Sequence, residues 1–119
     1  MKKTAIVVDD EQDIVEIFSD LLEEKGISVI GRGFNGNDAI NLYKANKPDI
    51  VFVDIMMPDS SGFTAIKNIR ATNKSAFIIA VTADVRELTE NKLKELEVNH
   101  VAYKPIDLNE VMKVIENSF

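Results

Sequence analysis

The sequence of 119 residues contains no cysteine and no tryptophan, and only one histidine. Without cysteine there is no disulfide framework, no thiolate zinc site and no cysteine nucleophile. A single histidine cannot build a histidine-rich metal site. No apolar run approaches the roughly 20 residues that span a bilayer, and the run at 5–8 is too short for a signal peptide. We therefore expect a cytoplasmic protein without membrane insertion.

Positive charge is also scarce, with 14 Lys and Arg against 20 Asp and Glu and a net charge of −6. An acidic chain without a basic cluster is a poor nucleic-acid binder, so we expect no direct contact with nucleic acid. Such a chain suits metal cations or basic partner surfaces better. The apolar fraction of 45% is typical of a globular protein, and the length predicts a single domain over residues 1–119.

Short apolar runs alternate with amphipathic segments along the chain. The runs at 5–8, 50–53 and 77–81 are continuous, as in strands covered on both faces of a parallel sheet. The shorter runs at 29–30 and 101–103 indicate edge strands. The segments between the runs carry apolar residues at helical spacing. These stripes are Ile14, Val15, Phe18, Leu21 and Leu22; Ala39, Ile40, Leu42 and Tyr43; Phe63, Ile66 and Ile69; Val85, Leu88, Leu93 and Leu96; and Leu108, Val111, Met112 and Ile115.

Five successive strand–helix units predict an α/β fold with right-handed crossovers and helices on both faces of the sheet. With the second and fifth strands at the edges, the expected architecture is a flavodoxin-like, doubly wound, five-stranded parallel sheet of order 2-1-3-4-5 with five helices. Ligands of such sheets bind beyond the carboxyl ends of the strands. The chain places these residues there: Asp9 and Asp10, Asp54, Thr82 and Ala83, and Lys104 and Pro105.

Three carboxylates brought to one sheet edge repel one another, by roughly 4 kcal/mol per pair at 4 Å and an effective dielectric of 20. A divalent cation would remove this cost, and an all-oxygen ligand set favours Mg²⁺ or Mn²⁺. A carboxylate beside such an ion can attack phosphorus, and Lys104 can balance charge on the transferring group. The pattern therefore predicts a phosphoryl-transfer site.

Each of these residues also has a purely structural explanation. Asp9 and Asp10 could complement the dipole of the following helix, Asp54 and Thr82 could be turn or cap residues, and Lys104 could be a solvated loop charge. Their coincidence at one sheet edge favours the site.

A rival motif is the literal G-x-G-x-x-G of residues 31–36, which is followed by the acidic Asp54 as in dinucleotide-binding proteins. The motif sits on a predicted edge strand, and the chain is short for two nucleotide-binding halves. We therefore interpret it as a glycine-permissive loop with Asn35–Gly36 as a turn.

Taken together, these residues make the chain resemble, over essentially its whole length, the receiver domain of two-component response regulators. The matching marks are Asp9–Asp10, Asp54 after Val51–Val53, Met57–Pro58 with Gly62, Thr82–Ala83, Lys104–Pro105, and Asn35–Gly36 in the second loop.

The resemblance implies that Asp54 is the phosphoacceptor for a phosphohistidine on a sensor histidine kinase or a histidine phosphotransfer protein. It implies that Asp10, Asp54 and the backbone oxygen of Met56 bind Mg²⁺, while Asp9 acts mainly through a water. Lys104 would pair with the phosphoryl group, and the Thr82 hydroxyl and Ala83 amide would bind its oxygens. The Lys104–Pro105 peptide bond would be cis.

The implied output is a population shift that changes binding of a downstream effector protein or output domain through the strand 4–helix 4–strand 5 surface. Such a protein assists its own phosphorylation and dephosphorylation but is not a turnover enzyme. The family usually places Tyr or Phe three residues before the lysine, where this chain has Val101, with Tyr103 two residues on. Two alternatives stay open: a phosphohydrolase of the haloacid-dehalogenase kind, and a module used only for protein contact.

Overall fold

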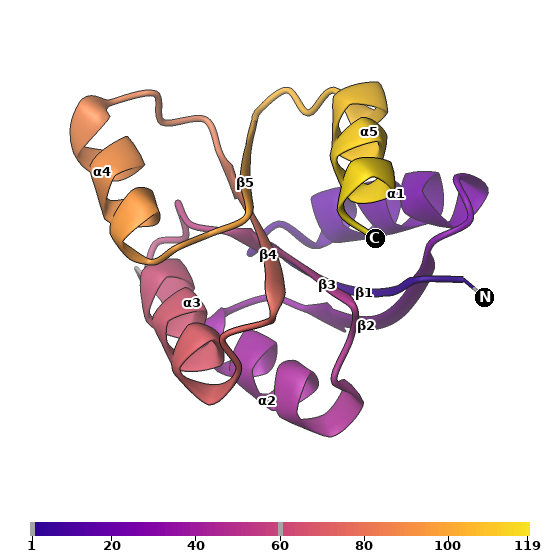
Figure 1. Cartoon of the computed structure of the whole chain (residues 1–119), viewed down its shortest axis with the longest axis horizontal. Coiled ribbons are helices and arrows are strands. Elements are labelled where there is room, and N and C mark those ends of the chain that lie inside the picture. The colour runs from indigo at the N-terminus through magenta and orange to yellow at the C-terminus, as the bar shows by residue number, and fades with distance from the viewer. Residues whose placement is uncertain (1, 60) are drawn as a thin grey trace.

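The computed structural model describes residues 2–59 and 61–119. Its five parallel strands form one sheet of order β2-β1-β3-β4-β5, so the predicted strand order and both edge strands are confirmed (Figure 1). The strands are β1 (Thr4–Val8), β2 (Ser28–Gly33), β3 (Ile50–Asp54), β4 (Phe77–Thr82) and β5 (His100–Tyr103).

Five helices alternate with these strands, as predicted. They are α1 (Gln12–Glu24), α2 (Gly36–Asn46), α3 (Ser61–Thr72), α4 (Glu87–Glu95) and α5 (Leu108–Ser118). Within the described ranges, no helix combines the length and hydropathy that a bilayer crossing needs.

The core lies in two layers, one on each face of the sheet. On one face, side chains of β1, β3 and β4 pack against α2, α3 and Leu93 of α4. On the other face they pack against α1 and α5 (Figure 1). The central strand β3 is buried along its whole length. Phe18 of α1 meets Phe52 of β3 edge-to-face at 5.1 Å, which fixes α1 against the centre of the sheet.

The fourth apolar stripe departs most from a core-facing helix, although Ile14 and Leu21 of the first stripe are also 37% and 40% exposed. Val85 precedes α4 and is 74% exposed, and Leu88 is 78% exposed, so the prediction that they face the core is wrong. The inward face of α4 is instead set by Thr89 and Leu93, which are four residues apart and share one side of the helix. Leu88 therefore points away from the sheet.

The glycine motif at 31–36 serves helix packing. Asn35 is the N-cap of α2, its side chain accepting a hydrogen bond from the Asp38 amide at 2.8 Å. Gly36 is the first residue of α2, and a Cβ there would collide with Ser61 at the start of α3. The expected turn is thus a helix cap, and the motif begins on the edge strand β2, where the Gly33 carbonyl accepts a hydrogen bond from the Asp9 amide at 3.2 Å.

Candidate functional site

A cluster of three carboxylates lies at the carboxyl end of the sheet. Asp9 follows β1 and Asp54 ends β3, and these strands are neighbours in which Val8 pairs with Val53. One carboxylate oxygen from each of Asp9, Asp10 and Asp54 lies within 4.8 Å of the others. Asp9 and Asp54 are buried, at 4% and 3% exposed, whereas Asp10 is exposed. The predicted convergence of these three residues is confirmed.

Lys104 joins the cluster from the end of β5. Its Nζ donates to Asp9 Oδ2 and to Asp54 Oδ2, both at 3.1 Å. Its backbone amide donates to the Thr82 carbonyl at 2.8 Å, which fixes the end of β5 beside that of β4. Burial disfavours the charged ammonium, but its hydrogen bonds to the two carboxylates outweigh burial and raise the pKa of Lys104. The following Lys104–Pro105 peptide bond is cis, as predicted.

The Oδ1 atom of each buried carboxylate accepts a hydrogen bond from the backbone amide two residues further along the chain. The Met56 amide donates to Asp54 Oδ1 at 2.9 Å, and the Glu11 amide donates to Asp9 Oδ1 at 3.0 Å. Gly62 packs so closely against the backbone of the Asp54 turn that a Cβ there would lie 2.6 Å from the Asp54 carbonyl oxygen. Local backbone therefore orients both carboxylates before any ligand arrives.

The charges in the cluster are unbalanced, since three carboxylates face one ammonium. Burial raises the pKa of Asp54, and repulsion by Asp9 adds to this, against the opposing effects of the Met56 amide and Lys104. Desolvation and the adjacent Asp9 likewise raise the pKa of Asp10, although this residue is exposed. Hard oxygen donors with excess negative charge fit a divalent cation.

The other predicted site residues surround this cluster. Thr82 is fully buried at the end of β4, one residue beyond Val81, which pairs with Asp54. Ala83 is exposed in the loop that follows, and the Met56 side chain is 49% exposed. Val101 is half-buried, whereas Tyr103 pairs with Thr82 in the sheet register and is 39% exposed.

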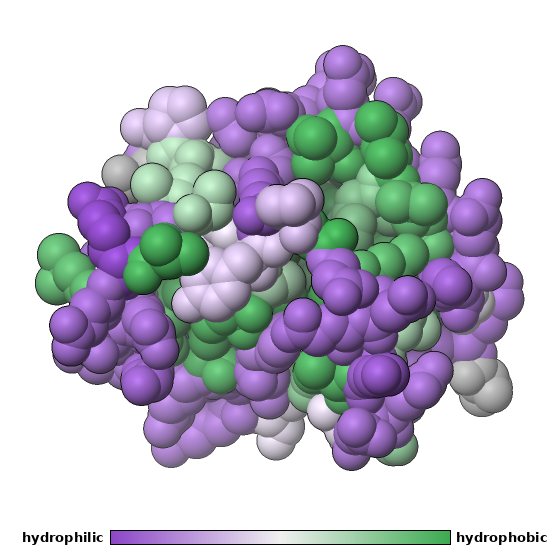
Figure 2. All heavy atoms as spheres, turned by 90° about the horizontal axis from the view of Figure 1, so that it is seen from above, coloured by the Kyte–Doolittle hydropathy of each residue, from purple (hydrophilic) through white to green (hydrophobic). Residues whose placement is uncertain are grey.

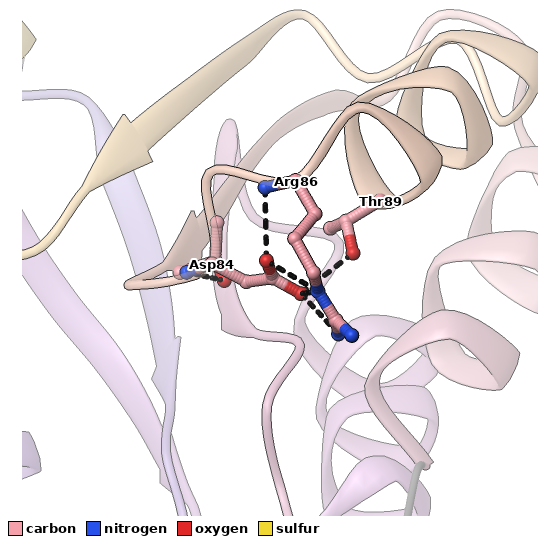
Figure 3. A network of polar contacts seen from close by, with 4 residues as sticks. Asp84, Arg86 and Thr89 are labelled. Carbon is pink, nitrogen blue, oxygen red and sulfur yellow. Dashed lines mark hydrogen bonds and ion pairs between the residues drawn. The ribbon is translucent and has the colours of Figure 1, made fainter.

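Two features beside the site carried little sequence signal. One is a polar network in which the Asp84 carboxylate holds Arg86 and Thr89 at the start of α4 (Figure 3). The other is an apolar groove of about 280 Å³ between α1 and the loop after β5. Lys104 is part of the groove lining, together with Ile14, Ile17, Phe18, Leu21, Pro105, Ile106 and Leu108. Apolar side chains gather on this side of the molecule in Figure 2.

The sequence and the structure both match known proteins. The family model of the response regulator receiver domain matches residues 5–116. The chemotaxis protein CheY of Thermotoga maritima is 39% identical over 83 residues, which cover 70% of this chain and 69% of the relative. CheY of Bacillus subtilis is 28% identical over 118 residues, covering 99% and 98%. A CheX–CheY–BeF₃–Mg²⁺ complex from Borrelia burgdorferi has a chain with a TM-score of 0.88 and 26% identity, covering 97% of this chain and 87% of that one.

Proposed function

Because this chain belongs to the response regulator receiver domain family, we propose that it is a phosphoacceptor switch whose Asp54 takes a phosphoryl group from a histidine-containing partner. One observation carries the proposal. The Lys104 ammonium bridges the buried carboxylates of Asp9 and Asp54 at the sheet edge where Asp10 also lies. This arrangement combines a nucleophile, a cation and a set of oxygen ligands in one place.

The proposed reaction transfers a phosphoryl group from a histidine nitrogen of the partner to a carboxylate oxygen of Asp54. A carboxylate oxygen of Asp54 forms a bond to phosphorus while the P–N bond of the phosphohistidine breaks. The imidazole leaves with the electron pair and later takes a proton from solvent. The Met56 amide, which holds Asp54 Oδ1, fixes the orientation of the nucleophile. Lys104, already 3.1 Å from Asp54 Oδ2, faces the negative charge that gathers on the transferring group.

The donor set proposed for Mg²⁺ or Mn²⁺ consists of Asp10, Asp54 and the backbone oxygen of Met56, with Asp9 acting through a water. When bound, the ion would neutralise the excess carboxylate charge and polarise the phosphoryl oxygens. The Thr82 hydroxyl and the Ala83 amide are proposed to bind the remaining phosphoryl oxygens. Two observations support this role for Thr82. The residue is fully buried. Its hydroxyl accepts one hydrogen bond, from the Asp84 amide, and keeps its own hydrogen to donate.

The apolar groove supports a protein as phosphoryl donor. Lys104 contributes both to the groove and to the carboxylate cluster, so a partner that delivers a phosphohistidine to Asp54 meets the exposed Ile17 and Leu21 nearby. We propose a sensor histidine kinase or a histidine phosphotransfer protein in this position. The output is proposed to pass to a downstream effector or output domain through the surface of β4, α4 and β5.

Acetyl phosphate and Mg²⁺ followed by intact-mass measurement test this function. The wild-type chain should gain the mass of one phosphoryl group, and EDTA should prevent the gain. Asp54→Asn should gain nothing, whereas Asp13→Asn, an exposed carboxylate on the first turn of α1, should behave as wild type.

A gain of mass that persists in Asp54→Asn would refute the assignment of Asp54. No gain in the wild-type chain, together with unchanged partner binding, would favour a module used only for protein contact. Sustained release of phosphate from small phosphomonoesters would favour a turnover phosphohydrolase instead.

A further inference from the structure

The segment that joins β2 to α2, residues 33–36, forms hydrogen bonds with both turns that carry the carboxylate cluster. At one end, the Gly33 carbonyl accepts from the Asp9 amide at 3.2 Å. At the other end, the Gly36 amide donates to the Ser61 hydroxyl at 2.7 Å, and Ser61 begins α3 after the turn that follows β3. This connecting segment therefore bridges the turn after β1 and the turn after β3.

The connecting segment is held in one conformation by side chains of its own neighbourhood. The Phe34 amide donates to Asp38 Oδ2 at 2.9 Å, and the Asp38 amide donates to Asn35 Oδ1 at 2.8 Å. Its last residue is pressed against α3, because a Cβ on Gly36 would collide with the Ser61 carbonyl oxygen. Helices α2 and α3 lie side by side on one face of the sheet (Figure 1), so the segment is fixed along its length and at both ends.

The Ser61 hydroxyl is oriented for its contact by Asp59. It donates to Asp59 Oδ1 at 2.6 Å, and the Ser61 amide donates to the same oxygen at 3.1 Å. These hydrogen bonds lower the pKa of Asp59, so the acceptor stays ionised at neutral pH. Because the one hydroxyl hydrogen is used on Asp59, the lone pairs of the hydroxyl are left for the Gly36 amide. The next residue, Gly62, packs directly against the backbone of Asp54.

We propose that Ser61 is a positioning residue, which through the connecting segment holds the Asp54 turn at the distance from Asp10 that a shared divalent cation needs. This inference rests on the proposed function, which assigns a cation to the carboxylate cluster. Ser61 acts on the cation only through the two turns. Groups that orient the ligands of a metal tune its affinity even though they do not bind it themselves.

The charge of the cluster gives this bridge work to do. One oxygen from each of three carboxylates lies within 4.8 Å of the others, and their repulsion drives the two turns apart whenever no ion is bound. Mg²⁺ demands a near-ideal octahedral arrangement with oxygens at about 2.1 Å from the ion. A bridge that resists the separation keeps the ligands near that arrangement, so that less ordering is needed when the ion binds.

Binding of Mn²⁺ to the full chain, measured from the EPR signal of the free ion, tests the inference. Ser61→Ala should raise the dissociation constant of Mn²⁺ at least ~3-fold, because the Gly36 amide loses its acceptor. Ser61→Thr retains the hydroxyl and should bind Mn²⁺ as the wild type does. The matched control, Ser75→Ala, removes an exposed hydroxyl before β4, at the opposite end of the sheet, and should leave the dissociation constant unchanged.

The rate of phosphorylation by acetyl phosphate separates positioning from catalysis. At saturating Mn²⁺ the bound ion itself holds the two turns together. The rate for Ser61→Ala should then stay within ~2-fold of the wild-type rate, although more Mn²⁺ is needed to reach it. A rate that stays low at saturating Mn²⁺ would overturn the proposed role, because the defect would then lie beyond ion binding.

A second pair of variants tests the same bridge through Asp59, which is exposed and is therefore expected to tolerate replacement even if Ser61→Ala does not fold. Asp59→Asn removes the charge but keeps an acceptor oxygen, whereas Asp59→Ala removes both. Asp59→Ala should therefore bind Mn²⁺ more weakly than Asp59→Asn.

The inference is overturned, and the proposed function left standing, if Ser61→Ala binds Mn²⁺ as tightly as the wild type and Asp59→Ala binds it as tightly as Asp59→Asn. An equal loss of affinity in Ser61→Ala and in Ser61→Thr or Ser75→Ala would overturn it too. A wild-type chain that binds no Mn²⁺ would overturn the inference together with the cation site of the proposed function.

Discussion

Replacing Asp54 with asparagine is expected to stabilise the protein when no divalent cation is present. The carboxylate of Asp54 is buried and lies within 4.8 Å of oxygens from Asp9 and Asp10. Asparagine has nearly the same shape but carries no charge. The substitution therefore removes the repulsion and the desolvation of one ionised group while it leaves the packing in place.

The magnitude follows from the distances. At an effective dielectric of 20, repulsion across 4.8 Å is about 3.5 kcal/mol and attraction to Lys104 across 3.1 Å is about 5 kcal/mol. The repulsion from Asp10 is weakened by solvent because that side chain is exposed. The Coulomb contributions thus nearly cancel, and the burial of the charge decides the sign. We expect Asp54→Asn to raise the free energy of unfolding by about 1–2 kcal/mol at neutral pH.

The pH dependence has a definite sign. The pKa of Asp54 in the folded protein is raised above its ordinary value of 3.8, so folding favours the protonated form. The contribution of Asp54 to stability is therefore fully present below 3.8 and is lost as pH rises through the folded pKa. The advantage of Asp54→Asn should be present at pH 7 and should shrink to nearly zero as pH falls below 3.8.

Urea unfolding in EDTA and in Mg²⁺ provides the assay. Mg²⁺ at 100 times its dissociation constant should stabilise the wild-type protein by about 2.7 kcal/mol, and Asp54→Asn should lose most of this gain. The order of stability is then expected to reverse between EDTA and Mg²⁺. An Asp54→Asn protein that is less stable than wild type in EDTA at pH 7 would refute the reasoning, because the ionised carboxylate would then be a net stabilising group.

Three further predictions concern the scaffold, and urea unfolding measures each of them. Arg70→Met should destabilise the protein by about 2–3 kcal/mol, since the guanidinium bonds the Ala76 and Glu97 carbonyls at 2.7 and 2.8 Å; an unchanged midpoint would contradict this. Gly62→Ala should cost about 2 kcal/mol or more, because its Cβ would lie 2.6 Å from the Asp54 carbonyl, and full stability would show that the turn can shift. Ser19→Ala should stabilise by about 1 kcal/mol, because the buried Ser19 hydroxyl has no hydrogen-bond partner among the described residues; a loss of stability would reveal one.

The fold could be predicted because its determinants are local in the sequence. The continuous apolar runs of β1, β3 and β4 specify strands buried on both faces, and the weaker runs of β2 and β5 specify edges. Once the strand order is known, the carboxyl ends of β1 and β3 lie side by side, and β5 ends at the same edge of the sheet beyond β4. Topology therefore brings Asp9 and Asp54 together, whereas the contact with Lys104 also needs its long side chain to reach across β4.

Features that depend on tertiary contacts could not be predicted in the same way. The stripe containing Val85 and Leu88 has helical spacing, but the helix begins only at Glu87 and turns its Thr89–Leu93 side inward. The ion pair between Asp84 and Arg86 depends on how the loop between β4 and α4 folds. Residues two apart in a loop have no fixed geometry that a sequence pattern could reveal. Likewise, the glycine spacing at 31–36 matches a nucleotide motif, although packing of α2 against α3 accounts for Gly36.

The donor chemistry of Lys104 connects the resting site with its proposed phosphorylated form. A lysine ammonium has three hydrogens to donate, and Asp9 and Asp54 each accept one of them. The third hydrogen can therefore meet a phosphoryl oxygen while the contact with Asp9 remains. A rotatable ammonium suits this change of partners better than the rigid fork of an arginine. Lys104 also donates its amide to the Thr82 carbonyl, so the group that would sense the phosphoryl charge already sits on the strand beside Thr82.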